Sequence, residues 1–248
     1  MGTARGNNLD FFNVLGIDGA RTRDIWREGI QAIVKLLRDD NVAIENDFWK
    51  FSGVTIHPKM PGNPIPPFYS VATGLDSHKH TGLLGMGDMA WDGYFGWRYL
   101  EDCYNVYKTA IKEAKPVTGT VLNSFSYFVT AAAIREDRAH ALQDVEQRAF
   151  AFVDLIMRAY GKVATQPSYE YYEELQVVKE KQRDLPSLMK HGPSVMAGTP
   201  DDVCAMCERL QKLGVDEIVL SIDGISHESH LETIRMMGKY VIPAFSKA

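Results

Sequence analysis

His78 and His80 are the residues of this chain best suited to proton transfer or metal binding. They lie two positions apart, directly after a turn at residues 73–77. Imidazole titrates near neutral pH and is a common metal ligand, so the pair could act as a base or hold an ion. Pairs of this kind are more often solvated loop residues, and the sequence leaves both interpretations open.

A second polar group, Asp223, His227, Glu228 and His230, follows the last predicted strand. In parallel α/β folds, active-site residues sit on loops that follow strands, so this group is also a candidate. The polar residues that begin a surface helix would explain the same pattern.

Cys204 and Cys207 form a C-x-x-C pair, which is a redox or zinc signature in other contexts. Here the pair lies inside a predicted helix, with no second cysteine pair, and Cys207 falls on its apolar face. We therefore predict packing roles. Three cysteines in all give no disulfide framework and favour a reducing compartment.

The last fifty residues predict the elements that position such groups. Thr199 is a suitable N-cap, Pro200 fits the first helical turn, and apolar residues then recur at helical spacing up to Gly214. An apolar strand at 216–222 and a second helix ending near Pro243 follow. A buried strand between helices is a unit of a parallel sheet covered by helices.

The rest of the chain predicts the same class of fold. Strands are expected at 68–72, 83–89 and 121–131, and helices at about 22–40, 97–114 and 136–160. Residues 41–67 have no sustained hydrophobic period and end in a loop rich in prolines. Residues 161–195 are predicted to form a polar excursion with a helical patch near 169–183. We predict one α/β domain over 1–248, with four convincing parallel strands.

Composition excludes several classes of protein. The chain has 248 residues, of which 45% are hydrophobic and 24% charged, and a net charge of -5. This balance argues against non-specific nucleic-acid binding, which requires clustered cations. There is no apolar run of about 20 residues and no signal pattern, so we predict a cytoplasmic protein without a membrane segment.

Ordered motifs along the chain resemble the bacterial luciferase-like flavin monooxygenases. The closing unit reads Gly-Thr-Pro-acid-acid-Val from Gly198, then Gly-Val-Asp-Glu-Ile-Val-Leu from Gly214, and ends Val-Ile-Pro-Ala-Phe at Phe245. Near the start, Arg5-Gly6, an acid-aromatic pair, a Gly-x-Asp and an Arg-x-x-aromatic-x-Glu helix start at Arg23 are similar to the region after the family's fourth strand.

The resemblance implies a TIM-type (β/α) barrel of eight strands, of which this chain supplies about four. We therefore expect an incomplete barrel, the C-terminal half, through truncation, a fragmentary sequence or a natural half-barrel. Its first and last strands would be open edges, which invite pairing. We predict a homo-oligomer that covers them.

The resemblance also places a flavin-phosphate site. It assigns cofactor binding to Arg5 and to Thr73, Gly74 and Ser77, an assignment with a physical basis. A guanidinium is a forked donor to phosphate, glycine permits close backbone approach, and a helix N-terminus favours an anion. The alternative is that Arg5 is a solvated terminal charge and the turn only a turn.

No residue inherits the family's active-site histidine, which belongs to strands this chain lacks, and we assign no metal site. An aromatic group could form a wall for flavin or substrate, or could be core: Trp91, Tyr94, Phe95 and Trp97.

The implied activity is oxygenation of a small organic substrate by oxygen and reduced FMN, with the FMN supplied by a separate flavin reductase. Two alternatives stay open. One is a deazaflavin-dependent hydride transfer, as in some relatives. The other is a non-catalytic protein, either a flavin-binding remnant or a partner subunit.

Overall fold

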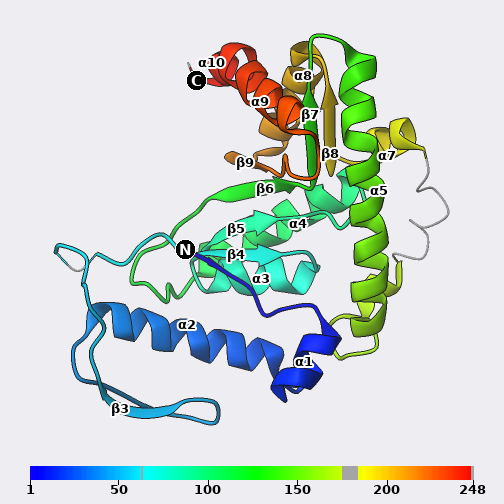
Figure 1. Ribbon diagram of the computed structural model, residues 1–248. Helices are drawn as coiled ribbons and strands as arrows, with labels where there is room; N and C mark the ends of the chain where they lie inside the picture. The colour runs from blue at the N-terminus through cyan, green and yellow to red at the C-terminus, as the bar shows by residue number, and fades with distance from the viewer. Residues whose placement is uncertain (63, 175–183, 247–248) are drawn as a thin grey trace.

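The computed structural model describes residues 1–62, 64–174 and 184–246 (Figure 1). A parallel sheet of five strands lies at its centre, in the order β1-β4-β5-β6-β9. The strands are β1 (Gly2–Thr3), β4 (Tyr69–Ala72), β5 (Gly87–Ala90), β6 (Phe125–Val129) and β9 (Glu217–Leu220). All neighbouring pairs are parallel, as the predicted α/β class requires.

A further pair of strands forms a separate two-stranded sheet next to the main one. Strand β6 continues through Thr130 into β7 (Ala131–Ile134), which pairs in parallel with β8 (Val195–Gly198). The Thr130 amide and hydroxyl both donate to the Ser194 carbonyl, at 2.9 and 2.8 Å. In the described part of the chain the strands do not close into a barrel, because β1 and β9 end the main sheet.

Helices join the strands and cover the sheet. The longer ones are α2 (Thr22–Arg38), α4 (Trp97–Ala110), α5 (Arg138–Val163) and α8 (Pro200–Leu213). The shorter ones are α1 (Leu9–Leu15), α3 (Leu75–Leu83), α7 (Leu185–His191), α9 (His227–Met236) and α10 (Ile242–Phe245). Short 3-10 turns lie at Gly19–Arg21, Ile111–Glu113 and Glu170–Glu174, and a π turn at Met237–Val241.

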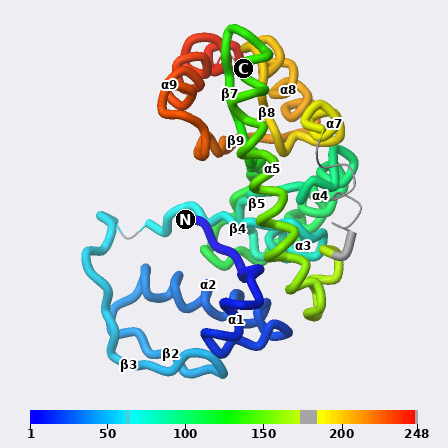
Figure 2. The backbone as a smooth tube through the Cα atoms, turned by 45° about the vertical axis from the view of Figure 1, so that its right-hand side comes forward, coloured from blue at the N-terminus to red at the C-terminus, as the bar shows by residue number. Residues whose placement is uncertain are grey.

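Helix α5 links the two ends of the molecule (Figures 1 and 2). It packs on β7 and β8, and its last turns reach α1. There the Asn7 side-chain amide donates to the Tyr160 hydroxyl at 2.6 Å, and Lys162 pairs with Asp10 at 2.7 Å. These contacts fix the N-terminal segment that carries Arg5.

The structure bears out most of the predicted elements. Helices α2, α4, α5 and α8 and strands β4, β6 and β9 lie within or close to the expected ranges. The strand expected at 83–89 begins four residues later, because Leu83 and Leu84 end α3 and Gly85 turns the chain with φ +65°. One domain over the whole chain stays a prediction.

Two regions differ from the prediction. Residues 41–67 contain an antiparallel hairpin of β2 (Val42–Glu45) and β3 (Lys50–Val54), with an irregular register that hides its alternation. The predicted polar excursion contains α7 and ends in β8, a four-residue strand too short to show a period. The helical patch near 169–183 begins as the Glu170–Glu174 turn, and 175–183 lie outside the described residues.

Candidate functional site

A small notch opens where β1 and β4 end, beside the first turn of α3. We call it the α3 notch. Arg5 enters it from the segment after β1, Arg23 from α2, and Ser77 from α3. Its lining is Arg5, Arg23, Trp26, Ser70, Val71, Ser77 and His80. Loops after parallel strands form one face of such a sheet, which is why these distant residues meet.

Arg23 is the most constrained cation of the notch. Its side chain is only 18% exposed, and its Nη1 lies 2.5 Å from an Asp76 carboxylate oxygen and 2.7 Å from His80 Nδ1. Nη2 is buried and has no hydrogen-bond partner among the described residues. Burial lowers the pKa of Arg23, and the nearby charge of Arg5 lowers it further. An anion in the notch would relieve both effects.

Arg5 is held by the segment that follows α5. Its Nη1 donates to the Ser168 hydroxyl at 2.7 Å and its Nη2 to the Ser168 carbonyl at 2.9 Å. The guanidinium also lies 4.0 Å from the centre of the Tyr169 ring. Arg5 is therefore ordered by Ser168 and Tyr169 at a partly exposed position, and its role in phosphate binding stays a prediction.

No side chain of the described residues caps the start of α3. Gly74 is the N-cap residue, and its carbonyl accepts from the amides of Ser77 and His78 at 2.8 and 3.3 Å. A helix without a capping side chain leaves backbone N–H groups and the positive end of its dipole for a ligand.

Thr73 and Gly74 lie just before this turn, under tyrosine side chains. The Thr73 carbonyl accepts from the Tyr99 hydroxyl at 2.9 Å, and its side chain bonds Tyr172. A Cβ on Gly74 would lie 2.6 Å from the Tyr171 ring, so the position requires glycine. The structure thus brings Arg5 and Ser77 together and places Thr73 and Gly74 beside them, outside the notch lining.

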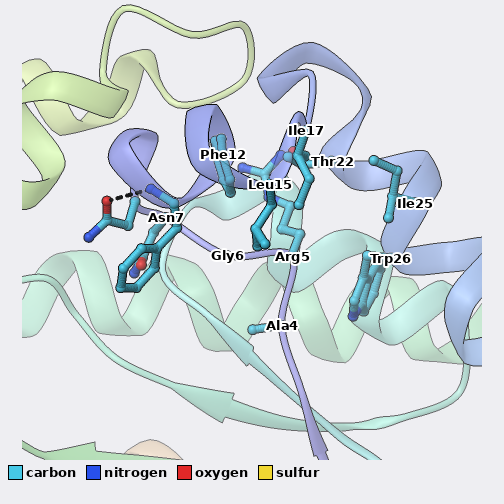
Figure 3. Close-up of a pocket in the computed structure, with 12 residues that line it drawn as sticks. Ala4, Arg5, Gly6, Asn7, Phe12, Leu15, Ile17, Thr22, Ile25 and Trp26 are labelled. Atoms are coloured by element: carbon cyan, nitrogen blue, oxygen red, sulfur yellow. Dashed lines mark hydrogen bonds between the residues drawn. The ribbon is translucent and has the colours of Figure 1, made fainter.

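A larger cleft lies on the other side of Arg5, between α1 and α2 (Figure 3). Its volume is about 440 Å³. Phe12 and Leu15 from α1 face Ile25 and Trp26 from α2 across it, and Arg5 and Trp26 are shared with the α3 notch. The cleft is mainly apolar, and among the described residues that line it Arg5 is the one with a charged side chain.

The two candidate histidines lie in different environments. His80 lies at the notch against Arg23, whereas His78 is fully buried, with its Nδ1 2.7 Å from Asp88 Oδ2. The solvated-loop interpretation is wrong for His78, and the two rings do not share a ligand. No cluster of three metal-binding side chains occurs in the described ranges.

The other sequence candidates have structural roles. Ser226 caps α9, and His227 begins it, which is the helix-start interpretation. Asp223 accepts from Ser221 and lies 3.2 Å from Arg148, and these contacts lower its pKa. Cys204 and Cys207 are free thiols of α8, and burial raises the pKa of Cys207 to about 11, consistent with packing.

The four residues of the predicted aromatic wall have different neighbours. Trp91 and Tyr94 are core residues in edge-to-face contact, and Trp91 also packs on Phe152 and Tyr160. Phe95 packs against Tyr99. Trp97 instead faces α8, where the Arg209 guanidinium lies 3.7 Å from its ring centre. The four residues form no single wall.

Sequence reasoning missed two residues. Arg23 was visible only as part of an Arg-x-x-aromatic-x-Glu helix start, with no sign that it faces the turn at 73–77. Asp88 lies in a predicted strand interior, where a lone acid already suggests a buried partner.

Comparison with known proteins agrees with this architecture. The family model for luciferase-like monooxygenases matches residues 1–217. The fold is similar to that of monooxygenase RslO1 from Streptomyces bottropensis (21% identity over 99% of this chain and 68% of that chain, TM-score 0.69). It is also similar to that of the coenzyme F420-dependent tetrahydromethanopterin reductase of Methanopyrus kandleri (18% identity over 98% of this chain and 73% of that chain, TM-score 0.67).

A third similar structure is the oxygenating constituent of 3,6-diketocamphane monooxygenase from Pseudomonas putida, in complex with FMN (16% identity over 98% of this chain and 70% of that chain, TM-score 0.65). These likenesses confirm the predicted fold class, an incomplete luciferase-like (β/α) barrel with an open sheet. In the part of the chain that is described, no helix is both long and apolar enough to cross a membrane.

Proposed function

The chain belongs to the luciferase-like monooxygenase family, and we propose that it is a flavin-dependent monooxygenase acting on a small organic substrate. Reduced FMN would come from a separate flavin reductase. The proposal rests on the α3 notch, whose lining includes Arg5, Arg23 and Ser77, and on Nη2 of Arg23, a buried donor without a hydrogen-bond partner among the described residues.

The donor groups of the notch match a phosphate monoester, and because the volume of the notch is only about 10 Å³, side chains at its rim must move apart to admit one. Arg5 and Arg23 offer two permanently charged donors, and Ser77 offers a hydroxyl. The uncapped start of α3 adds backbone N–H groups and a favourable dipole. Nη2 of Arg23 is a buried donor, and a phosphate oxygen would give it the acceptor it lacks.

We assign the residues the following roles. Arg5, Arg23 and Ser77 bind the phosphate, and Arg5 exchanges its bonds to Ser168 for phosphate oxygens. Gly74 keeps the backbone accessible beside Tyr171, and Thr73 supports the turn through Tyr99. When bound, reduced flavin supplies the electrons and the reaction with oxygen. The protein binds it, orients it and limits its contact with water.

We keep one alternative cofactor and one alternative function. A deazaflavin is the second candidate cofactor, supported by the fold similarity to an F420-dependent reductase. A deazaflavin enzyme would transfer hydride instead of oxygenating. A non-catalytic flavin-binding protein or partner subunit is the second function, supported by the open edges β1 and β9.

We also propose a homo-oligomer, because an open edge strand invites pairing and Val219 of β9 is an exposed apolar side chain. The cytoplasm is the proposed compartment.

Flavin titration tests the cofactor, and oxygen consumption tests the reaction. We expect saturable FMN binding, and oxygen uptake when a flavin reductase and NADH supply reduced FMN. Binding of coenzyme F420 with no response to FMN would favour the hydride-transfer alternative. Binding of FMN without uptake across a panel of small ketones and aldehydes would favour a non-catalytic flavin-binding protein. No binding of FMN or F420 would contradict both enzyme hypotheses and favour a partner subunit.

A further inference from the structure

Helix α3 carries Ser77 and packs closely on α4 and β5. Its buried residues are His78, Thr81 and Gly82, which include no large apolar side chain. A surface helix normally buries an apolar stripe, and a short helix depends on its tertiary contacts for stability. Among the described residues, no side chain caps its start. Its buried polar residues are therefore candidates for fixing its rotation.

His78 and Asp88 provide that interaction. Nδ1 of His78 lies 2.7 Å from Oδ2 of Asp88 on β5, and both side chains are completely buried. His78 Nε2 and Asp88 Oδ1 have no partner among the described residues. A buried polar pair has strict geometric requirements, because separating its members would leave two unpaired groups without solvent.

Gly82 holds the other end of α3. A Cβ at this position would lie 2.9 Å from Ala110 Cβ and 2.9 Å from the Tyr107 carbonyl of α4. The helix is therefore pinned at two points, by a buried pair near its start and by close backbone contact near its end.

The groups around His78 favour one shared proton. Asp88 faces it from β5 and Cys103 from α4, while the Phe125 ring of β6 lies 6.4 Å away. Tyr107 of α4 interacts with Asp88, and Asp92 interacts with Cys103. On α3 itself, Asp76 and His80 contact Arg23, away from the pair, and Lys79 is exposed. Burial is the largest effect on His78 and opposes its charge, but Asp88 and Cys103 together raise the pKa of the imidazole well above 6.5.

We propose that His78 and Asp88 are positioning residues for the anion-binding turn, and that they fix the rotation of α3 so that Ser77 faces Arg5 and Arg23. Consecutive helical residues point about 100° apart. Anchoring His78 inward therefore sets the direction of its neighbour Ser77. This inference rests on the proposed function for the identity of the anion, but not for the anchoring itself.

The test compares Asp88→Asn and His78→Gln with His140→Gln, a control on α5 whose side chain is 74% exposed. Amide hydrogen exchange is measured without ligand, and FMN affinity by fluorescence quenching. In Asp88→Asn and His78→Gln we expect protection to fall at residues 77–83, whose amides are hydrogen-bonded within α3, by more than it falls in the sheet. FMN affinity should fall at least about tenfold. The control His140→Gln should match the wild type in amide exchange and in FMN affinity.

Uniform loss of protection, or unchanged protection at 77–83, would overturn the positioning role. If the variants fail to fold, exchange in the wild type decides the question. Protection at 77–83, corrected for intrinsic rates, should fall at alkaline pH before protection of the sheet falls. A wild type that binds no FMN would refute the proposed function, and the exchange results would still decide the anchoring.

Discussion

Helices α3 and α8 begin in opposite ways. Thr199 caps α8, its side chain accepts from the Asp202 amide, and the Asp202 carboxylate accepts from the Thr199 amide. Val203, Cys207 and Leu210 bury the face of α8. Helix α3 has a glycine cap without a side-chain bond, and it buries polar residues.

The difference separates a helix whose start is satisfied by its own side chains from a helix whose start we propose as an anion site. The start of α8 is already satisfied by its own carboxylates, so it has no place for an anion. The start of α3 is left open, next to two arginines, and is held from behind by His78 and Asp88. Where local sequence rules are broken and distant residues compensate, a functional site is the expected cause.

The largest effect is expected from Asp88→Asn, which breaks the anchor of α3. Removing one member of a buried pair should lower the free energy of unfolding by about 3 kcal/mol in urea denaturation. A loss comparable to that of Thr199→Ala would contradict the contrast between the two helices.

The same variant predicts a pH dependence. The raised pKa of His78 means that its contribution is complete below its ordinary value of 6.5 and is lost as pH rises through the higher folded-state value. The raised pKa of Asp88 acts in the same direction. The stability difference between wild type and Asp88→Asn should therefore shrink as pH increases in parallel denaturation series. A difference that grows with pH would refute the shared proton.

Gly82→Ala should have the next largest effect, at about 2 kcal/mol, because the added methyl overlaps Ala110 and the Tyr107 carbonyl. Gly161→Ala is the matched control, since nothing lies within 4 Å of its Cβ position in α5. Alanine there should stabilise by roughly 0.5 kcal/mol through helix propensity. Thermal unfolding measures the shift in melting temperature of both variants, which should be downward for Gly82→Ala and upward for Gly161→Ala. Equal shifts would contradict the claim that the contact at Gly82 holds α3 in place.

Arg23→Gln should weaken FMN binding about tenfold, because it removes the buried donor of the notch. Arg21→Gln, which removes an exposed ion pair with Asp47, is the control and should leave affinity unchanged. Calorimetric titration measures both. An equal loss of FMN affinity in the two variants would mean that the phosphate does not bind at Arg23.

Thr199→Ala should give the smallest effect. Loss of the cap should cost about 1 kcal/mol of stability and leave FMN affinity at the wild-type value. A change in affinity would mean that α8 takes part in binding, which would weaken its contrast with α3.

The same contrast explains what the sequence could predict. Helix α8 was predicted from local signals: an N-cap, proline in the first turn, apolar spacing and Gly214 at its end. Strand β8 and the β2–β3 hairpin have four or five residues and depend on tertiary pairing, so no local period marks them. The proximity of Arg5 and Ser77 was expected through the resemblance, while Arg23 required the packing of α2 onto the sheet.

The burial of His78 was also beyond local reasoning. Its neighbours Asp76, Ser77, Lys79 and His80 make the stretch look solvated. Only the return of the chain through β5, which brings Asp88 to the inner face of α3, gives the ring a partner. Polar residues reach the core in pairs, and such pairs are formed by topology and not by spacing.

The most direct test of the central claim compares FMN with riboflavin, which differ only in the phosphate. The affinity of the wild-type protein for oxidised FMN should exceed that for riboflavin by at least about tenfold. The preference should disappear in Arg23→Gln and persist in Arg21→Gln. Equal affinity for the two flavins in the wild type, or a preference that survives Arg23→Gln, would contradict a phosphate site at the start of α3.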